Sequence, residues 1–118
     1  MSLTSSVPVL RVSDYDRARR FWCDILRFEI VEEAGEPITG FGIYRSGAAT
    51  VFLIAWDGPE AAYDRWRAYF HTDDLDDIAT HLTAQSAQFN GPVTTEYNMR
   101  EIEVTDPDGN VICFGQDA

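Results

Sequence analysis

The sequence has 118 residues and a mass of 13.3 kDa, which is enough for one domain with its own core. It contains 20 acidic and 9 basic residues, so the formal net charge is 9 − 20 = −11, which argues against partners such as nucleic acid or an anionic membrane surface. All nine basic residues are Arg, which excludes Lys-dependent Schiff-base chemistry, and the absence of a long apolar run or a signal region favours a soluble cytoplasmic protein.

The first half of the sequence predicts one strand, one helix and then three strands. Val-rich alternation over residues 7–12 predicts the first strand, and Ser13 or Asp14 can cap the helix that follows. Apolar residues recur at helical spacing over 15–26, and Trp22 on this apolar face is expected in the core. The three later strands are expected over 28–32, 41–45 and 50–56.

The second half predicts the same succession of elements after a break at Asp57-Gly58-Pro59. Residues 60–65 are interpreted as a polar linker or a short helical turn, and Asp73-Asp74 as the cap of a helix over 75–86. A turn is expected at Asp106-Pro107-Asp108-Gly109, between the last two strands. The four strands of this half are expected over 67–72, 89–94, 99–105 and 110–116.

The two halves, residues 7–57 and 66–116, repeat one another. Residues 10–16 align with residues 70–76 at an offset of 60, and each half is predicted to form a βαβββ unit. One such unit cannot cover its own sheet, so two units are expected to associate. The sequence therefore predicts a single α+β domain over 1–118, with one curved mixed sheet, helices on its convex side and a concave ligand cleft.

Three segments carry a resemblance to a known family. Pro8–Asp14, with Phe21-Trp22 and Leu26–Glu29 after it, resembles the opening of vicinal oxygen chelate proteins, the glyoxalase, bleomycin resistance protein and dioxygenase superfamily. Asp73-Asp74-Leu75 resembles the start of the second helix of that family, and Met99–Asn110 resembles its closing hairpin. The resemblance covers roughly residues 7–116 and implies the same tandem βαβββ fold.

The resemblance also implies where a metal would be bound in this chain. Enzymes of the family hold a divalent ion with His, Gln or Glu, and these positions fall on Val7, Phe52 (or Leu53 with a register one residue off), Arg67 and Cys113. Val and Phe offer no donor atom and Arg would repel the ion. We therefore expect no metal and no other cofactor. The resemblance is strongest to the metal-free branch typified by bleomycin resistance proteins, whose dimers trap a drug without altering it.

Strand alternation predicts which side chains face the cleft. Tyr97 is added because the resemblance aligns it with an aromatic residue near the ligand. Arg67 needs a partner, which is Glu101, Glu103 or an anionic ligand group. The predicted ligand-binding residues are Phe52, Trp56, Arg67, Tyr69, His71, Tyr97, Glu101 and Cys113.

Several of these residues also have a purely structural interpretation. His71 can be an ordinary surface histidine, and Glu101 with Glu103 can form a solvated or interface face. Trp56 can be a packing residue at an interface that binds no ligand. Cys23 and Cys113 are expected as two buried thiols rather than as a disulfide.

Three functions remain compatible with the sequence. The first is a metal-free protein that sequesters a small aromatic or cationic molecule in the cleft of a homodimer, since an acidic protein suits a cationic ligand. The second is a lyase, isomerase or dioxygenase with an atypical metal or acid–base site at residues such as His71 and Glu101. The third is a scaffold or regulatory dimer whose cleft is filled by its own side chains.

Overall fold

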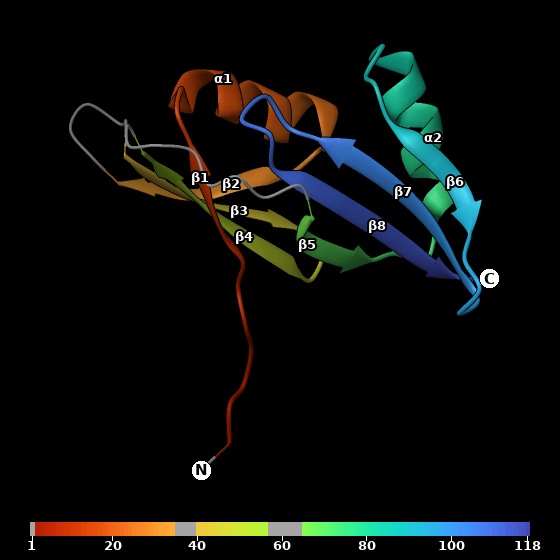
Figure 1. The fold of residues 1–118 in the computed structure, drawn as a ribbon. Helices are drawn as coiled ribbons and strands as arrows, with labels where there is room; N and C mark the ends of the chain where they lie inside the picture. Colours follow the sequence, from red (N-terminus) through yellow and green to blue (C-terminus); the bar gives the residue numbers. More distant parts are fainter. Residues whose placement is uncertain (1, 35–39, 57–64) are drawn as a thin grey trace.

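Each half of the chain forms a four-stranded mixed sheet in the computed structural model, which describes residues 2–34, 40–56 and 65–118 (Figure 1). The strand orders are β1-β4-β3-β2 and β5-β8-β7-β6, and in each sheet the first strand pairs parallel with the last while the other pairs are antiparallel. The strands of the first sheet are β1 (Val9–Val12), β2 (Glu29–Ala34), β3 (Phe41–Ser46) and β4 (Ala49–Ala55). Those of the second are β5 (Trp66–His71), β6 (Asn90–Thr94), β7 (Met99–Thr105) and β8 (Val111–Asp117).

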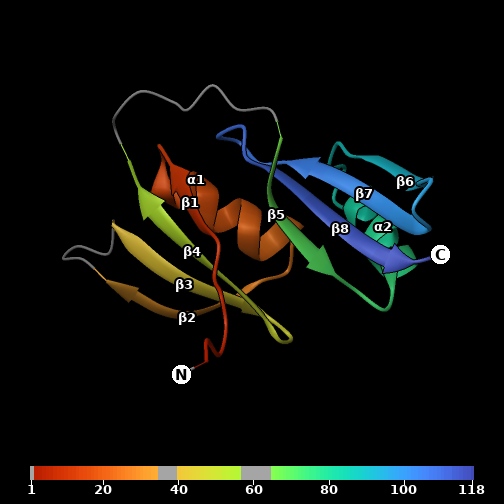
Figure 2. The same ribbon diagram turned by 60° about the horizontal axis from the view of Figure 1, so that its bottom comes forward.

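The identical strand orders confirm the tandem βαβββ repeat and the α+β class. One detail differs from the prediction, because hydrogen bonding divides the described strands into two separate sheets instead of one continuous sheet. The two sheets lie side by side in both ribbon views (Figures 1 and 2). The expected linker over 60–65 lies, except for Arg65, outside the described residues.

The first helix departs from the predicted uninterrupted α-helix over 15–26. Asp14 caps α1 (Tyr15–Arg20) by accepting the Arg17 N–H at 3.0 Å, which decides between the two candidate caps. The helix then widens into a π-helical segment, η1 (Phe21–Ile25), in which the Leu26 N–H donates to the Phe21 carbonyl at 3.1 Å. A π-helical segment of five residues is about one turn long and is too short to show its own apolar period, so the sequence did not reveal the change.

The second helix, α2 (Leu75–Ala84), ends two residues before the predicted end at residue 86. Asp74 is its cap and accepts the Asp77 N–H at 3.1 Å. Ser86 has a φ of 55°, a left-handed conformation that does not continue a helix.

The core lies between the helices and the sheet faces that they cover. Trp22 is fully buried, as predicted, and its Nε1–H points to Asp106 Oδ2 at 3.4 Å, so the first half contacts the second through this side chain. The largest fully buried side chains besides Trp22 are Tyr44, Leu53, Leu75, Leu82, Ile102 and Ile112.

The predicted turn at residues 106–109 also ties the halves together. Asp106 is buried and accepts the N–H groups of Asp108 and Asn110, and Gly109 has a φ of 83° that the turn requires. Asp108 then accepts the Ser13 N–H at 2.7 Å, just before α1. The hairpin that closes the second half thereby holds the start of the first helix.

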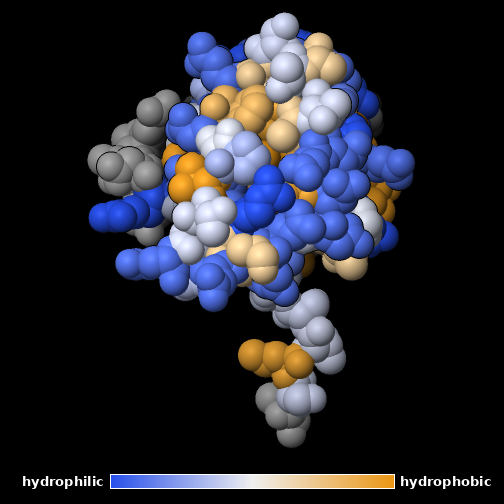
Figure 3. Space-filling view, turned by 90° about the vertical axis from the view of Figure 1, so that its right-hand side faces the viewer, coloured by the Kyte–Doolittle hydropathy of each residue, from blue (hydrophilic) through white to orange (hydrophobic). Residues whose placement is uncertain are grey.

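The molecular surface is mainly hydrophilic at the end that carries α2 and β6, as Figure 3 shows. The N-terminal segment extends away from the body in Figures 1 and 3, and Leu3 within it is 94% exposed. Among the described residues, no helix has the length and apolar character needed to cross a membrane.

Candidate functional site

The second sheet has a polar face that points away from the core and an apolar face that packs into the core. Tyr69 on β5 is in register with Cys113 on β8, which is in register with Glu103 on β7, so these side chains share one face. Glu101 and His71 both pair with Gly115 on the same face. The opposite face carries core residues such as Ile102, Ile112 and Phe114. The register agrees with the predicted alternation from Ala68 to His71 and along β7 and β8. It shifts between Trp66 and Ala68, so strict alternation does not extend to Trp66 at the start of β5.

Glu101 is the centre of the polar face. It is only 7% exposed, and its Oε2 accepts the Tyr69 hydroxyl at 2.8 Å. The Tyr97 hydroxyl lies 3.0 Å from both carboxylate oxygens. We call Tyr69, Tyr97 and Glu101 the phenol–carboxylate cluster. The two phenols satisfy the buried carboxylate without cancelling its charge, and the interpretation of Glu101 as a solvated surface residue is therefore wrong.

Gly115 makes this cluster possible. A Cβ atom at Gly115 would lie 1.9 Å from the Tyr69 hydroxyl oxygen and 2.4 Å from Cζ of the same ring. The missing side chain therefore leaves room for the Tyr69 ring to cross β8 and reach Glu101 on the next strand. A glycine inside a strand often marks such a close approach, so the sequence held a signal that was not used.

A second carboxylate lies beside the cluster. Trp66 donates its indole N–H to Glu103, and the Trp66 ring centroid lies 5.0 Å from that of Tyr69. The Tyr69 centroid in turn lies 5.2 Å from that of His71. Two carboxylates next to a row of aromatic rings are suited to a cation, which ring faces and negative charge both attract.

The electrostatic environment keeps the hydroxyl and thiol groups of this face protonated. Burial, followed by the bond to Glu101 and its charge, raises the pKa of Tyr69, and the pKa of Tyr97 is raised by the same causes. Burial, with smaller effects from Glu101 and Glu103, raises the pKa of Cys113 to about 12. The phenols thus remain donors near pH 7, and Cys113 remains a neutral thiol.

The positions that hold the metal in the family's enzymes do not fit a metal in this chain. Val7 and Phe52 are apolar and Arg67 is cationic. Cys113 has a fully buried thiol whose raised pKa disfavours the thiolate that binds a metal. Within residues 2–34, 40–56 and 65–118, no three His, Cys, Asp or Glu side chains are grouped so as to hold an ion.

The eight predicted binding residues fall into two groups. Phe52 lies on β4 of the first sheet and packs on Phe41, with 5.2 Å between centroids. Trp56 directly follows β4 and lies under the Arg11 guanidinium, whose Cζ is 4.4 Å from the ring centroid. Trp56 is 42% exposed.

The other six predicted residues belong to the second sheet or to the turn before β7. His71 is exposed and Arg67 is partly buried. Cys113 lies on the expected face but is 0% exposed, so the prediction that it contacts a ligand needs correction.

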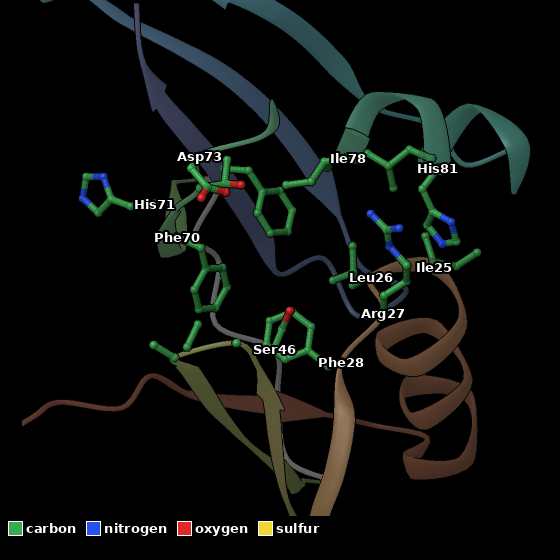
Figure 4. Close-up of a pocket in the computed structure, with 16 residues that line it drawn as sticks. Ile25, Leu26, Arg27, Phe28, Ser46, Phe70, His71, Asp73, Ile78 and His81 are labelled. Atoms are coloured by element: carbon green, nitrogen blue, oxygen red, sulfur yellow. The ribbon is translucent and has the colours of Figure 1, made fainter. Parts of the chain in front are cut away.

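A cavity of about 770 Å³ lies on the helix side, between the two halves. Figure 4 shows its lining, which comes from the η1–β2 junction, the β3–β4 turn, the end of β5 and one face of α2. We call it the inter-half pocket. Of the predicted binding residues only His71 lines it, whereas Arg27, Ser46 and His81 were assigned no role. Segments far apart in sequence form this pocket, so no local motif could reveal it.

Comparison with known proteins identifies the family. A family model described as Glyoxalase/Bleomycin resistance protein/Dioxygenase superfamily matches residues 5–114, almost the whole chain. A comparison with curated proteins finds no match.

Solved structures with the same fold include binding proteins and an enzyme. A bleomycin-binding protein complexed with bleomycin is 20% identical, with a TM-score of 0.82 over 98% of this chain and 100% of that chain. An antibiotic binding protein from Streptomyces sp. CB03234 is 23% identical, with a TM-score of 0.75 and full coverage of both chains. A lactoylglutathione lyase from Agrobacterium tumefaciens is 18% identical, with a TM-score of 0.74 over 96% and 92%. Because the fold is common to both kinds of protein, the function must be argued from the site.

Proposed function

Because the chain belongs to the Glyoxalase/Bleomycin resistance protein/Dioxygenase superfamily, we propose that it is a binding protein that sequesters a cationic, ring-containing small molecule without a metal ion. The observation that carries this proposal is the buried carboxylate of Glu101, which two neutral phenols hold in place. A carboxylate fixed in this way offers a preorganised negative charge to a ligand.

The ligand's charge and rings have separate partners on this face. A cationic group is attracted to Glu101 and Glu103, and ring systems can stack near Trp66 and Tyr69, whose centroids are 5.0 Å apart. The net charge of −11 adds long-range attraction for cations. Bleomycin, the molecule bound in one of the structures with this fold, combines positive charge with planar rings and is a suitable first probe.

The proposal includes a homodimer whose cleft joins both groups of predicted residues. On the first sheet and directly after β4, Val9, Ile54 and Trp56 are 56%, 36% and 42% exposed, which is unusual for large apolar side chains that lie close together. A second copy of the chain that placed this face opposite the phenol–carboxylate cluster would cover these side chains. The ligand would then lie between the two faces, with Phe52 and Trp56 on one side.

Titration calorimetry with bleomycin tests the proposed function. Glu101→Gln keeps the shape of the side chain but removes its charge, and loss of a charged hydrogen-bonding partner should weaken binding about 10- to 100-fold. Glu96→Gln is the matched control, because Glu96 is exposed on the same turn as Tyr97. It removes one unit of charge outside the cluster and should change affinity less than about twofold.

Two outcomes would contradict the proposal. The first is an equal loss of affinity in Glu101→Gln and Glu96→Gln, which would show that only the overall charge matters. The second is the absence of binding by both bleomycin and a planar dicationic dye. Wild-type protein treated with a chelator should bind bleomycin with the same affinity as untreated protein. A requirement for added zinc or manganese would refute the proposal that binding needs no metal ion.

A further inference from the structure

The inter-half pocket has the size and composition of a small-molecule site. Its volume of about 770 Å³ lies within the roughly 300–1,000 Å³ that is usual for such sites. Phe28, Phe70 and Phe114 contribute a continuous aromatic wall, with centroids 5.5 Å apart for Phe28–Phe70 and 5.8 Å apart for Phe70–Phe114. Ile25 and Ile78 extend the apolar lining.

The polar groups of the pocket leave little net charge. Arg27 forms an ion pair with Asp77, with 2.7 Å between Nη2 and Oδ2, so a negative charge lies directly beside the guanidinium. Asp73 lines the pocket on the other side, as Figure 4 shows. The two histidines of the lining are His71 and His81. This balance differs from the phenol–carboxylate face and favours an uncharged ligand.

His81 gives the pocket a hydrogen-bond acceptor. Its Nε2 lies 3.0 Å from the Asp24 carbonyl oxygen. A carbonyl oxygen can only accept, so Nε2 carries a proton, and Nδ1 is the acceptor nitrogen of this tautomer. Figure 4 shows His81 and Arg27 close together at the helix side of the pocket. A ligand with an N–H or O–H group can therefore donate to this ring.

Two uncommon backbone features border the same pocket. The π-helical segment η1 ends at Ile25, and Arg27 has a φ of 60° although it is not glycine. Both π-helical turns and left-handed non-glycine residues are concentrated at functional sites. Here both features fall within the three consecutive lining residues 25–27. The phenol–carboxylate cluster does not explain them, because it lies on the other face of the second sheet.

We propose that the inter-half pocket is a second small-molecule site, which takes an uncharged ring-containing molecule with a hydrogen-bond donor. The aromatic wall packs against the ring, and the donor is directed to His81. The site is separate from the phenol–carboxylate cluster, because Phe70 and Phe114 belong to the face of β5 and β8 opposite Tyr69 and Glu101. His71, the last residue of β5, borders both.

A fluorescence titration with N-phenyl-1-naphthylamine, an uncharged probe with a single N–H group, tests this site. We expect enhanced, blue-shifted emission that saturates at one probe per chain. Ala48→Trp places a large side chain in the lining and should weaken binding at least tenfold, whereas Ala84→Trp, on an exposed position of α2 outside the lining, should leave it unchanged. His81→Phe keeps the ring but loses the acceptor and should weaken binding about fivefold.

Two further measurements keep the test independent of variant folding and of the other site. Amide shifts of the wild-type protein should move at residues 25–28, 46–49 and 70–73 when the probe binds, and residues 90–94 should not move. Saturating bleomycin and Glu101→Gln should both leave probe affinity unchanged. The proposal is overturned if emission is not enhanced, if the two tryptophan variants bind equally, or if bleomycin displaces the probe.

Discussion

Replacing Gly115 with alanine tests how the phenol–carboxylate cluster is built. The new Cβ would lie 1.9 Å from the Tyr69 hydroxyl oxygen and 2.8 Å from Cε1, so the Tyr69 ring must leave its place over β8. The φ of Gly115 lies outside the left-handed region, so alanine adds no backbone strain. The expected damage is therefore confined to Tyr69 and its bond to Glu101.

The size of the effect follows from that bond. A hydrogen bond to a charged acceptor contributes about 1.5–3 kcal/mol, and exchanging Gly for Ala restores about 0.4–1 kcal/mol by restricting the unfolded chain. We expect Gly115→Ala to lower the free energy of unfolding by about 1–2 kcal/mol. Urea denaturation followed by tryptophan fluorescence measures this difference, provided that the denaturant dependence stays constant.

A double-mutant cycle gives the decisive comparison. The three nearest atoms to the added Cβ all belong to Tyr69, so in a Tyr69→Ala background Gly115→Ala should cost nothing or stabilise slightly. An equal cost in both backgrounds would refute the reasoning. Gly42→Ala is a useful comparator, because its Cβ would lie 2.2 Å from the Tyr15 hydroxyl on the buried helix side. It should destabilise more than Gly115→Ala without changing bleomycin affinity.

Three further predictions concern buried ionisable groups. Burial raises the pKa of Tyr44 to about 12 and also raises that of Tyr15, whereas both phenols ionise near pH 10 in the unfolded chain. The free energy of unfolding should therefore fall above pH 10, by up to about 1.4 kcal/mol per pH unit for each group. Tyr15→Phe should make this decline less steep in urea titrations at pH 8–11, and an unchanged slope would contradict the prediction. Iodoacetamide should modify the partly exposed Cys23 before the buried Cys113, by mass spectrometry of the native protein; equal rates would show that Cys113 is accessible. Asp106→Asn should cost about 1–3 kcal/mol, since an amide N–H₂ would face other donors, and a wild-type urea midpoint would disprove this.

The repeat made the fold predictable from sequence, because alternation and capping residues act locally in each half. Asp14 and Asp74 cap the two helices, and Trp22 is buried as its position on the apolar helix face implied. The change from α-helix to the π-helical segment η1 was not predictable, since a wider turn of only five residues is too short to alter the apolar pattern recognisably. The separation into two sheets depends on hydrogen bonds between distant strands, which periodicity does not report.

The candidate site was predictable in position but not in bonding. Alternation placed Tyr69 and Glu101 on one face, yet it could not show that Tyr69 crosses β8 to bind Glu101. That contact depends on the absence of a side chain at Gly115, two positions beyond the register partner of Tyr69. The inter-half pocket was missed because its lining comes from the junctions of elements in both halves, and junction geometry is set by tertiary packing.

The repeat also places two hairpins at equivalent positions in the halves, and the two hairpins have different roles. The β7–β8 turn joins the halves, because Asp106 and Asp108 accept hydrogen bonds from Trp22 and Ser13 of the other half. The equivalent β3–β4 turn lines the inter-half pocket, and Gly47 at its tip has a φ of 58°, which favours glycine at that one position. Ser46, Ala48 and Ala49 beside it line the pocket as well. New ligand preferences could evolve, or be engineered, at these three residues without changing the hairpin that joins the halves.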